Sequence, residues 1–221
     1  LHAPLVLPDA GGVAVQVAVD GPDDEGRRAV TLHSTTDAAE PEAPWVRHAT
    51  GWLVEPSKEP PALDDTAWPP TGATPLELTG CYDGLAERGL SYGPAFRGLR
   101  AAWRRGDELF AEVTIPDLRH DDQGLHPALL DSALHAQLVA EEGDAVVPFA
   151  WSGVEVFASG ASLLRVRMAP ADGDGVSLTA VDQQGQMVVA ADSLVTRPLG
   201  ELGEGAAPGA GELFGVEWAE W

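Results

Sequence analysis

The sequence predicts an α+β fold in which antiparallel strands surround a central helix. Residues Val13 to Val19 alternate between valine and smaller or polar residues, and this period-2 pattern is typical of a half-buried strand. One stretch instead repeats leucine every fourth residue, which is the spacing of one helix face, at Leu130, Leu134 and Leu138. A faint internal repeat aligns VRHATGWLVEP (46–56) with VVAADSLVTRP (188–198) without gaps. Together these patterns favour two related, strand-rich halves.

Composition excludes several classes of partner and site. The 221 residues are 44% apolar, which is enough for a core and for one or two domains. A net charge of −22 argues against nucleic acid and against an anionic membrane surface, both of which attract Lys and Arg. A single cysteine, Cys81, excludes an intrachain disulfide framework and a cysteine-based zinc site. No run approaches the roughly 20 apolar residues of a membrane span, so we expect a cytoplasmic protein.

The first quarter of the chain is predicted to form strands alone. Strand-like runs cover Val13 to Val19, Arg28 to Ser34 and Trp45 to Val54, with a Gly- and Pro-containing turn at 21–26. No helix of three turns is predicted before residue 54. A small antiparallel sheet is therefore expected to have an apolar face that nothing local covers.

A proline-rich segment from 57 to 80 is predicted to link this first half to a second one. A short helix is expected over Thr79 to Arg88, followed by strands over Arg97 to Trp103 and Glu108 to Ile115. The main helix is predicted over 127–141, because Pro127 suits a first helical turn and Gly143 ends the pattern. Four further strands are expected, over Trp151 to Phe157, Ser162 to Met168, Val176 to Val181 and Met187 to Thr196.

The predicted domain boundaries follow from these elements. Residues 1–56 are the remainder of the first half, 57–80 the linker, 81–198 the second half, and 199–221 a Gly- and Ala-rich linker that leads into a following region. The second repeat copy follows a central helix, whereas the first copy begins without one. We therefore expect that the helix of the first half is missing from this chain.

Three short segments carry residues suited to chemistry: SYGPAF (91–96), LHPALLDSALH (125–135) and VPFAW (147–151). Asp131 and His135 lie four residues apart on the main helix and hence on one face. Desolvation favours the protonated form of a carboxyl group, so an aspartate on a Leu- and Ala-rich helix suits a general acid. The alternative is an ordinary solvated surface pair. A metal site is not predicted, because His126 lies on a different face and no further ligand completes a shell.

In this order, the three segments resemble the dehydratase domain of modular type I polyketide synthases. HAPLVLP, RHATG and the closing strand match the framework of that family, so the resemblance covers residues 1–198, and ELFGVEW (212–218) resembles the entry to a ketoreductase region. The resemblance implies a double hotdog, in which two antiparallel sheets each wrap round a central helix. It also implies an enzyme of antibiotic biosynthesis, a lyase that removes water from a β-hydroxyacyl chain to give the α,β-enoyl thioester.

The family uses an aspartate on the second helix, here Asp131, and a histidine from the first half. That histidine stands in a motif of His, three residues, Gly, four residues and Pro. None of the six histidines carries the complete motif; His48 comes closest, with Gly51 and Pro56 each one position short. We therefore expect that the segment with the catalytic histidine is also missing from this chain.

The resemblance assigns further roles. His135 would orient Asp131, Tyr92 would bind near the β-hydroxyl, and Gly93 and Pro94 would shape the substrate tunnel, which VPFAW would line or support through Pro148, Phe149 and Trp151. No metal or redox cofactor is implied. The substrate would arrive on the phosphopantetheine arm of an acyl carrier protein, within a homodimeric synthase whose neighbouring domains are further partners.

Two alternatives stay open. The same residues could shift a double bond or close a cyclic ether, or the domain could be a non-catalytic spacer in the synthase. Five arginines lie between 88 and 105, and among them Arg104 and Arg105 are candidates to receive the carrier protein, because local potential steers encounter even on an acidic protein. The simpler interpretation of this cluster is a solvated strand edge.

Overall fold

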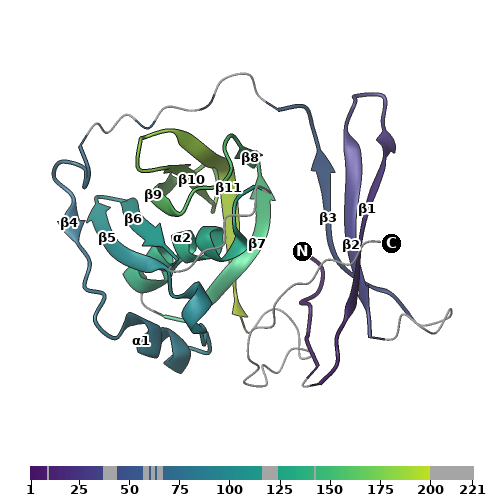
Figure 1. The fold of residues 1–221 in the computed structure, drawn as a ribbon, viewed down its shortest axis with the longest axis horizontal. Coiled ribbons are helices and arrows are strands. Elements are labelled where there is room, and N and C mark those ends of the chain that lie inside the picture. The colour runs from purple at the N-terminus through teal and green to yellow at the C-terminus, as the bar shows by residue number, and fades with distance from the viewer. Residues whose placement is uncertain are drawn as a thin grey trace. The chain divides into compact units, whose positions relative to one another are not determined.

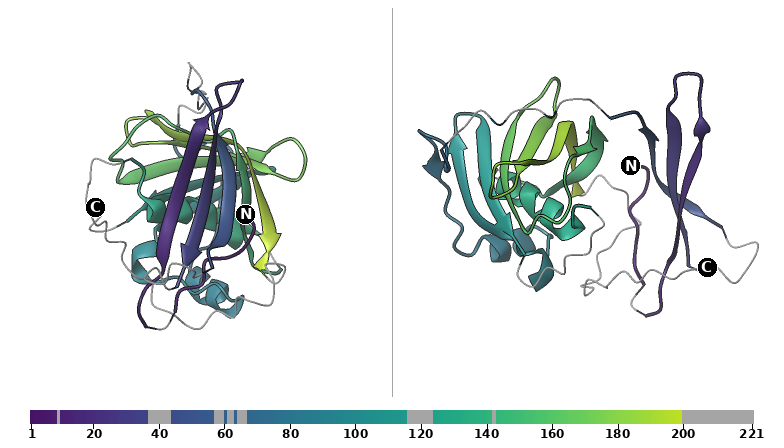
Figure 2. Two further views of the ribbon diagram at one scale, coloured as in Figure 1. Left: turned by 90° about the vertical axis from the view of Figure 1, so that its right-hand side faces the viewer. Right: turned by 45° about the horizontal axis from the view of Figure 1, so that its top comes forward.

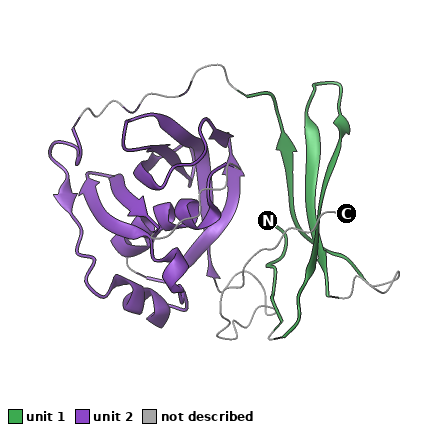
Figure 3. Ribbon diagram, in the orientation of Figure 1, with its two compact units in different colours: residues 1–56, 200–221 green, residues 57–199 purple. Residues whose placement is uncertain are grey.

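The computed structural model describes residues 1–8, 10–36, 44–56, 60, 63, 67–115, 124–141 and 143–199. The chain divides into two compact units, with the described residues of Leu1–Pro56 in one and those of Ser57–Leu199 in the other (Figure 3). The predicted strand at ELFGVEW lies outside the described residues.

The first unit is a three-stranded antiparallel sheet in the order β1-β2-β3. Its strands are β1 (Ala14–Pro22), β2 (Arg28–Thr35) and β3 (Val46–Leu53), and Leu32 of β2 pairs with Val17 on one side and Ala49 on the other. The described residues of this unit contain no helix, and large apolar side chains are exposed on one face of its sheet, among them Val15, Val17, Val19 and Leu53. The expected sheet with an uncovered apolar face is thus present.

The second unit wraps one sheet round a buried helix (Figures 1 and 2). The helix is α2 (Pro127–Ala140), and the strands are β4 (Thr74–Pro75), β5 (Leu99–Arg105), β6 (Glu108–Thr114), β7 (Val146–Ser152), β8 (Glu155–Val156), β9 (Leu163–Pro170), β10 (Val176–Val181) and β11 (Met187–Pro198). Their order is β4-β5-β6-β9-β10-β11-β7, and β8 pairs with β11. Alternate strand residues point at the helix, because side chains on a strand have a period of two.

The core of this unit lies between α2 and the concave face of the sheet. Leu129, Ala133 and Ala136 of the helix are fully buried, as are Val113 of β6 and Leu164 of β9. A Leu- and Ala-rich helix suits this position, since small residues allow the sheet to approach closely while leucines fill the remaining volume. The prediction of antiparallel strands around one long helix is confirmed.

The faint repeat corresponds to a shared topology. β1-β2-β3 and β9-β10-β11 are both consecutive antiparallel strands, and the aligned segments 46–56 and 188–198 fall on β3 and β11. In the second copy, α2 contacts β9 and shares a hydrophobic core with β9, β10 and β11. Among the described residues, no helix accompanies the first copy.

Two segments differ from the sequence-based expectation. The predicted linker 57–80 is not a free connection, because its β4 pairs with β5 and the Trp68 ring packs edge-on against Trp103 and Phe110 at 5.9 and 6.1 Å. Prolines mark an absence of regular backbone hydrogen bonds, but they do not prevent aromatic side chains from packing. In place of one strand over Trp151 to Phe157, the structure has β7, which begins at Val146 and ends at Ser152, and the separate two-residue β8. VPFAW therefore lies within β7. The short helix α1 (Cys81–Glu87) lies within its predicted range.

The two middle strands, β2 and β10, should differ in stability although both have antiparallel partners on either side. Amide hydrogens in β10 are expected to exchange with solvent much more slowly than those in β2, since opening β10 exposes a buried apolar core and opening β2 does not. Hydrogen exchange measured by mass spectrometry on the 221-residue chain checks this. Equal protection of the two strands would mean that the β1-β2-β3 face is covered in solution.

Candidate active site

Helix α2 positions the candidate acid, and its first turn depends on the His126-Pro127 pair. His126 is the N-cap residue, and its Nδ1 accepts a hydrogen bond from the Ala128 N–H at 3.2 Å. Pro127 follows in the first turn, where its missing N–H costs nothing. His126 therefore caps the helix and does not join the other histidine of this segment.

Asp131 and His135 form a bonded pair on α2, as their spacing predicts. His135 Nε2 lies 3.1 Å from Asp131 Oδ2. The His135 side chain is 1% exposed and that of Asp131 is 36% exposed. The pair therefore reaches from the core to the surface of a cavity. The alternative of a solvated surface pair is wrong for His135, because its side chain is buried.

Tyr82 of α1 completes this pair, and the sequence analysis did not identify it. Its hydroxyl lies 3.1 Å from His135 Nδ1 and accepts a hydrogen bond from the Leu99 N–H at 3.0 Å. Tyr82 and His135 are separated by 53 residues, so no local pattern indicates the contact. The scarcity of tyrosine in the sequence could have pointed to Tyr82, because the chain has two tyrosines and both pack against His135.

Tyr92 is the second of these tyrosines. Its ring centroid lies 4.1 Å from that of His135 and 6.0 Å from that of Tyr82. Burial, together with the negative charge of Asp131, raises the pKa of Tyr92 well above its usual range. The Tyr92 hydroxyl therefore keeps its hydrogen at neutral pH and is available as a donor beside the aspartate.

The SYGPAF segment is held against α2 by Ser132, the residue after Asp131. Gly93 precedes a short 3₁₀ helix, η1 (Pro94–Phe96), and the fully buried Ser132 Oγ donates to the Phe96 carbonyl at 3.0 Å. The same Oγ accepts from the Gly98 N–H at 3.2 Å. Gly93 and Pro94 thus start the turn that follows Tyr92, and this turn is bound to the residue next to Asp131.

Residues from all three predicted segments line one cavity of about 80 Å³. Tyr92, Asp131 and Pro148 represent the three segments. The other lining residues are mostly apolar, and they are Leu134, Gln137, Leu138, Val146, Val147, Leu194 and Thr196. A mostly apolar wall with a few polar groups is typical of a site for a small organic ligand.

Phe149 and Trp151 do not line this cavity. The register of β7 against β11 shifts at this point, with Pro148 opposite Thr196 and Ala150 opposite Val195, so Phe149 is the extra residue of a bulge. Its ring lies 3.6 Å from the Arg197 guanidinium, while Trp151 packs against the core. These two side chains support the wall that Val146 to Pro148 form.

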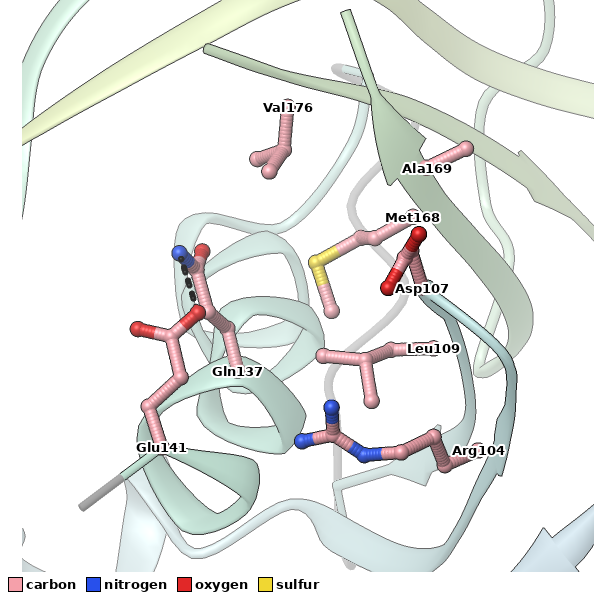
Figure 4. A pocket seen from close by; sticks show the side chains of 8 residues that line it. All are labelled: Arg104, Asp107, Leu109, Gln137, Glu141, Met168, Ala169 and Val176. Carbon is pink, nitrogen blue, oxygen red and sulfur yellow. Dashed lines mark hydrogen bonds between the residues drawn. The ribbon is translucent and has the colours of Figure 1, made fainter. Parts of the chain in front are cut away.

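A second cavity, of about 60 Å³, lies near the C-terminal end of α2 (Figure 4). Gln137 lines both cavities, and its amide donates to Glu141 Oε1 at 3.2 Å, the bond drawn dashed in the figure. Arg104, Asp107 and Met168 are among the other lining residues. This cavity has a mixed polar and apolar wall and none of the residues of the three motifs.

The arginines between 88 and 105 are bonded within the second unit. Arg88 and Arg104 donate to carbonyls at the end of α2, namely those of Leu138 at 2.6 Å and Ala140 at 2.8 Å, which suits the partial negative charge there. Arg105 Nε lies 2.9 Å from Glu108 Oε2. The guanidinium of Arg97 lies over the Tyr82 ring, and Arg100 donates to the Thr114 carbonyl. These contacts give the arginines a structural role.

Within the described ranges, no three His, Cys, Asp or Glu side chains are grouped so that they could hold a metal ion. No described helix is long and apolar enough to cross a membrane.

The sequence of this chain is similar to those of known proteins. A model of the polyketide synthase dehydratase N-terminal domain matches residues 60–206. The chain is 46% identical over 233 residues to polyketide synthase GfsE of Streptomyces halstedii, in an alignment that covers 99% of this chain and 6% of that protein. The chain thus spans a small part of such relatives, between 3% and 6% of the length of three of them.

Solved structures are similar as well. The dehydratase domain from the terminal module of the rifamycin polyketide synthase is 50% identical, with a TM-score of 0.80 over 89% of this chain and 72% of that chain. A bifunctional dehydratase-cyclase domain of ambruticin biosynthesis is 42% identical, with a TM-score of 0.73 over 88% of this chain and 72% of that one.

Proposed function

Since this chain belongs to the polyketide synthase dehydratase family and has its double-hotdog fold, we propose that it converts a β-hydroxyacyl thioester to the α,β-enoyl thioester. The observation that carries the proposal is the cavity in which a buried His135 holds Asp131 beside Tyr92. The resemblance of the three sequence motifs to those of this family supports the same assignment.

The proposed reaction removes one molecule of water. A base takes the α-proton, the electrons of that C–H bond form the new double bond, and the Cβ–O bond breaks. Asp131 gives its proton to the departing hydroxyl, which leaves as water. The aspartate is then an anion, and His135, whose Nε2 lies 3.1 Å from Oδ2, can stabilise it by donating a hydrogen bond.

Tyr92 has a distinct part in this scheme. It keeps its hydroxyl hydrogen at neutral pH, so it can hydrogen-bond to the β-hydroxyl oxygen and orient the C–O bond toward Asp131. The apolar cavity wall suits the acyl chain; it includes Leu134, Leu138, Val146 and Val147. No metal or redox cofactor takes part in the proposed scheme.

The base is a separate group from Asp131. In the first unit, His48 is bonded on both ring nitrogens, with Nε2 at 2.6 Å from Ser34 Oγ and Nδ1 at 3.1 Å from the Ala3 carbonyl. A histidine bonded in this way serves the packing of β2 and β3. We therefore do not assign the base to His48, although its sequence context comes closest to the family motif.

The test is product analysis with a synthetic β-hydroxyacyl thioester and the synthase that carries this chain. A product lighter by one water, with the ultraviolet absorbance of a conjugated enoyl thioester, is expected.

The similarity to a dehydratase-cyclase domain favours a second candidate, closure of a cyclic ether after dehydration. A substrate with a second, distal hydroxyl distinguishes them, because a cyclase would consume the enoyl product without further change of mass. A shifted double bond would indicate an isomerase, and unchanged substrate would indicate a spacer.

A carrier protein is the proposed source of the substrate, and Arg104 and Arg105 remain the predicted docking residues. Changing both to glutamate is expected to raise KM for carrier-bound substrate several-fold, because charges that reach the surface act mainly on encounter and both arginines are partly exposed. Turnover of a small thioester mimic should change little. The melting temperature must be measured alongside, since Arg104 also bonds the end of α2. Equal effects on both substrates, or none on either, would exclude this docking site.

A further inference from the structure

Tyr82, His135 and Asp131 form a continuous hydrogen-bonded chain from the backbone to the cavity. The Leu99 N–H donates to the Tyr82 oxygen at 3.0 Å, Tyr82 lies 3.1 Å from His135 Nδ1, and His135 Nε2 lies 3.1 Å from Asp131 Oδ2. His135 is fully buried, so water does not compete for its ring nitrogens. The Arg97 guanidinium lies 5.5 Å from the centre of the Tyr82 ring and helps to hold it in place.

The direction of these hydrogen bonds follows from the donors available. Burial raises the pKa of Tyr82, so the hydroxyl keeps its hydrogen. A backbone N–H only donates, and it already occupies one acceptor position of the Tyr82 oxygen. The hydroxyl hydrogen can then point at His135 Nδ1, which must be the unprotonated nitrogen. The ring hydrogen is consequently on Nε2, facing Asp131.

The opposite tautomer is disfavoured twice. With a hydrogen on Nδ1, the hydroxyl hydrogen of the half-buried Tyr82 would lose its acceptor on the His135 ring. The bare Nε2 would in addition face Asp131 Oδ2 with no hydrogen between them, unless Asp131 turned its own acidic proton toward the ring and away from the departing hydroxyl. Both conflicts disappear when Nε2 carries the hydrogen, so the two neighbours of His135 select the same tautomer.

We propose that Tyr82 is a positioning residue that holds neutral His135 in the Nε2–H tautomer, so that Asp131 Oδ2 always accepts and Oδ1 is the oxygen that delivers the proton. This inference rests on the proposed function for its catalytic meaning. The tautomer itself depends on the geometry alone. After the proton has left Oδ1, the Nε2–H bond to Oδ2 stabilises the remaining charge without any rearrangement of the histidine.

The first test is nitrogen NMR of protein labelled with ¹⁵N-histidine, because protonated and unprotonated ring nitrogens differ widely in chemical shift. Wild-type His135 is expected to show its hydrogen on Nε2. In Tyr82→Phe this preference should weaken, since the phenyl ring keeps the packing but cannot donate. Tyr92→Phe is the matched control: Tyr92 also packs on His135, but its hydroxyl has no hydrogen bond to that ring in the structure, so the tautomer should not change.

The second test is kinetic. Tyr82→Phe is expected to lower kcat about 5- to 10-fold, the usual effect of losing one hydrogen bond, with KM nearly unchanged. A wild-type His135 with its hydrogen on Nδ1 would overturn the proposal, as would a Tyr82→Phe variant with unchanged kcat or with an effect on KM alone. If the wild-type protein does not dehydrate the thioester, the proposed function fails, while the NMR result still decides the tautomer.

Discussion

Replacement of Asp131 by asparagine is expected to lower the rate of dehydration by about 10²–10⁴-fold, the usual contribution of a general acid. Asparagine keeps the shape of the side chain and can still accept a hydrogen bond from His135 Nε2, but it has no acidic proton to give to the departing hydroxyl. KM should change much less than kcat, because in the proposed reaction Asp131 acts mainly on the breaking C–O bond. The measurement is enoyl thioester formation by the synthase variant, with the melting temperature recorded for both proteins.

Asp174→Asn is the matched control. Asp174 lies exposed in the turn between β9 and β10, so this change removes the same charge outside the cavity and should leave the rate unaltered. If Asp131→Asn retained near-wild-type dehydration with unchanged folding, Asp131 would not be the acid. A loss of similar size in Asp174→Asn would instead point to a general effect of charge.

Replacement of Gly98 by alanine is expected to lower both the stability of the second unit and the rate of dehydration. A Cβ at this position would lie 2.5 Å from Ser132 Oγ, 2.8 Å from Ser132 Cβ and 3.3 Å from Ile115. Since Ser132 is fully buried on α2, the strand or the helix must shift, and overpacking of this kind typically costs about 1–3 kcal/mol. Because Ser132 follows Asp131 directly, the shift should also move the acid relative to Tyr92, and the dehydration rate should fall together with the melting temperature.

Gly84→Ala is the matched control, because a Cβ on Gly84 meets nothing within 4 Å in the helix α1 and should stabilise slightly. A double-mutant cycle with Ser132→Gly identifies the cause. Without the Ser132 side chain, the cost of Gly98→Ala should fall, since both close contacts are gone. An equal cost in the two backgrounds would show that the close approach of Gly98 to Ser132 is not what constrains this position.

The main elements of the second unit follow from local patterns in the sequence. Strands and helices differ in the period of their apolar residues, and this period is visible within a window of ten residues. The leucine spacing predicts α2 to within one residue of its end at Ala140, and the valine and alanine runs predict β10 and β11. The faint repeat indicated the shared topology of β1-β2-β3 and β9-β10-β11, because each aligned segment is one strand of a similar hairpin.

Long-range contacts behave differently, because no local spacing encodes them. The predicted linker contains Trp68, which packs on Trp103 and Phe110 of the sheet. Phe149 is the extra residue of a bulge in β7, with its ring beside Arg197, while Pro148 lies in the cavity wall. The bulge depends on the pairing of β7 with β11, which local spacing does not encode. The arginine cluster has the composition of a docking patch, but its guanidinium groups bond carbonyls that only the folded chain brings near.

The sequence by itself determined the family, the antiparallel strands around a central helix, and the pairing of Asp131 with His135, because motif order, periodicity and the i,i+4 spacing are all properties of short stretches of chain. Only the tertiary structure decided which side chains complete the site. Tyr82 reaches His135 across 53 residues because α1 packs against α2, and Tyr92 stands beside Asp131 because Ser132 binds the turn that follows it. Such contacts depend on how whole elements pack, and packing is determined by the combined shape of the core.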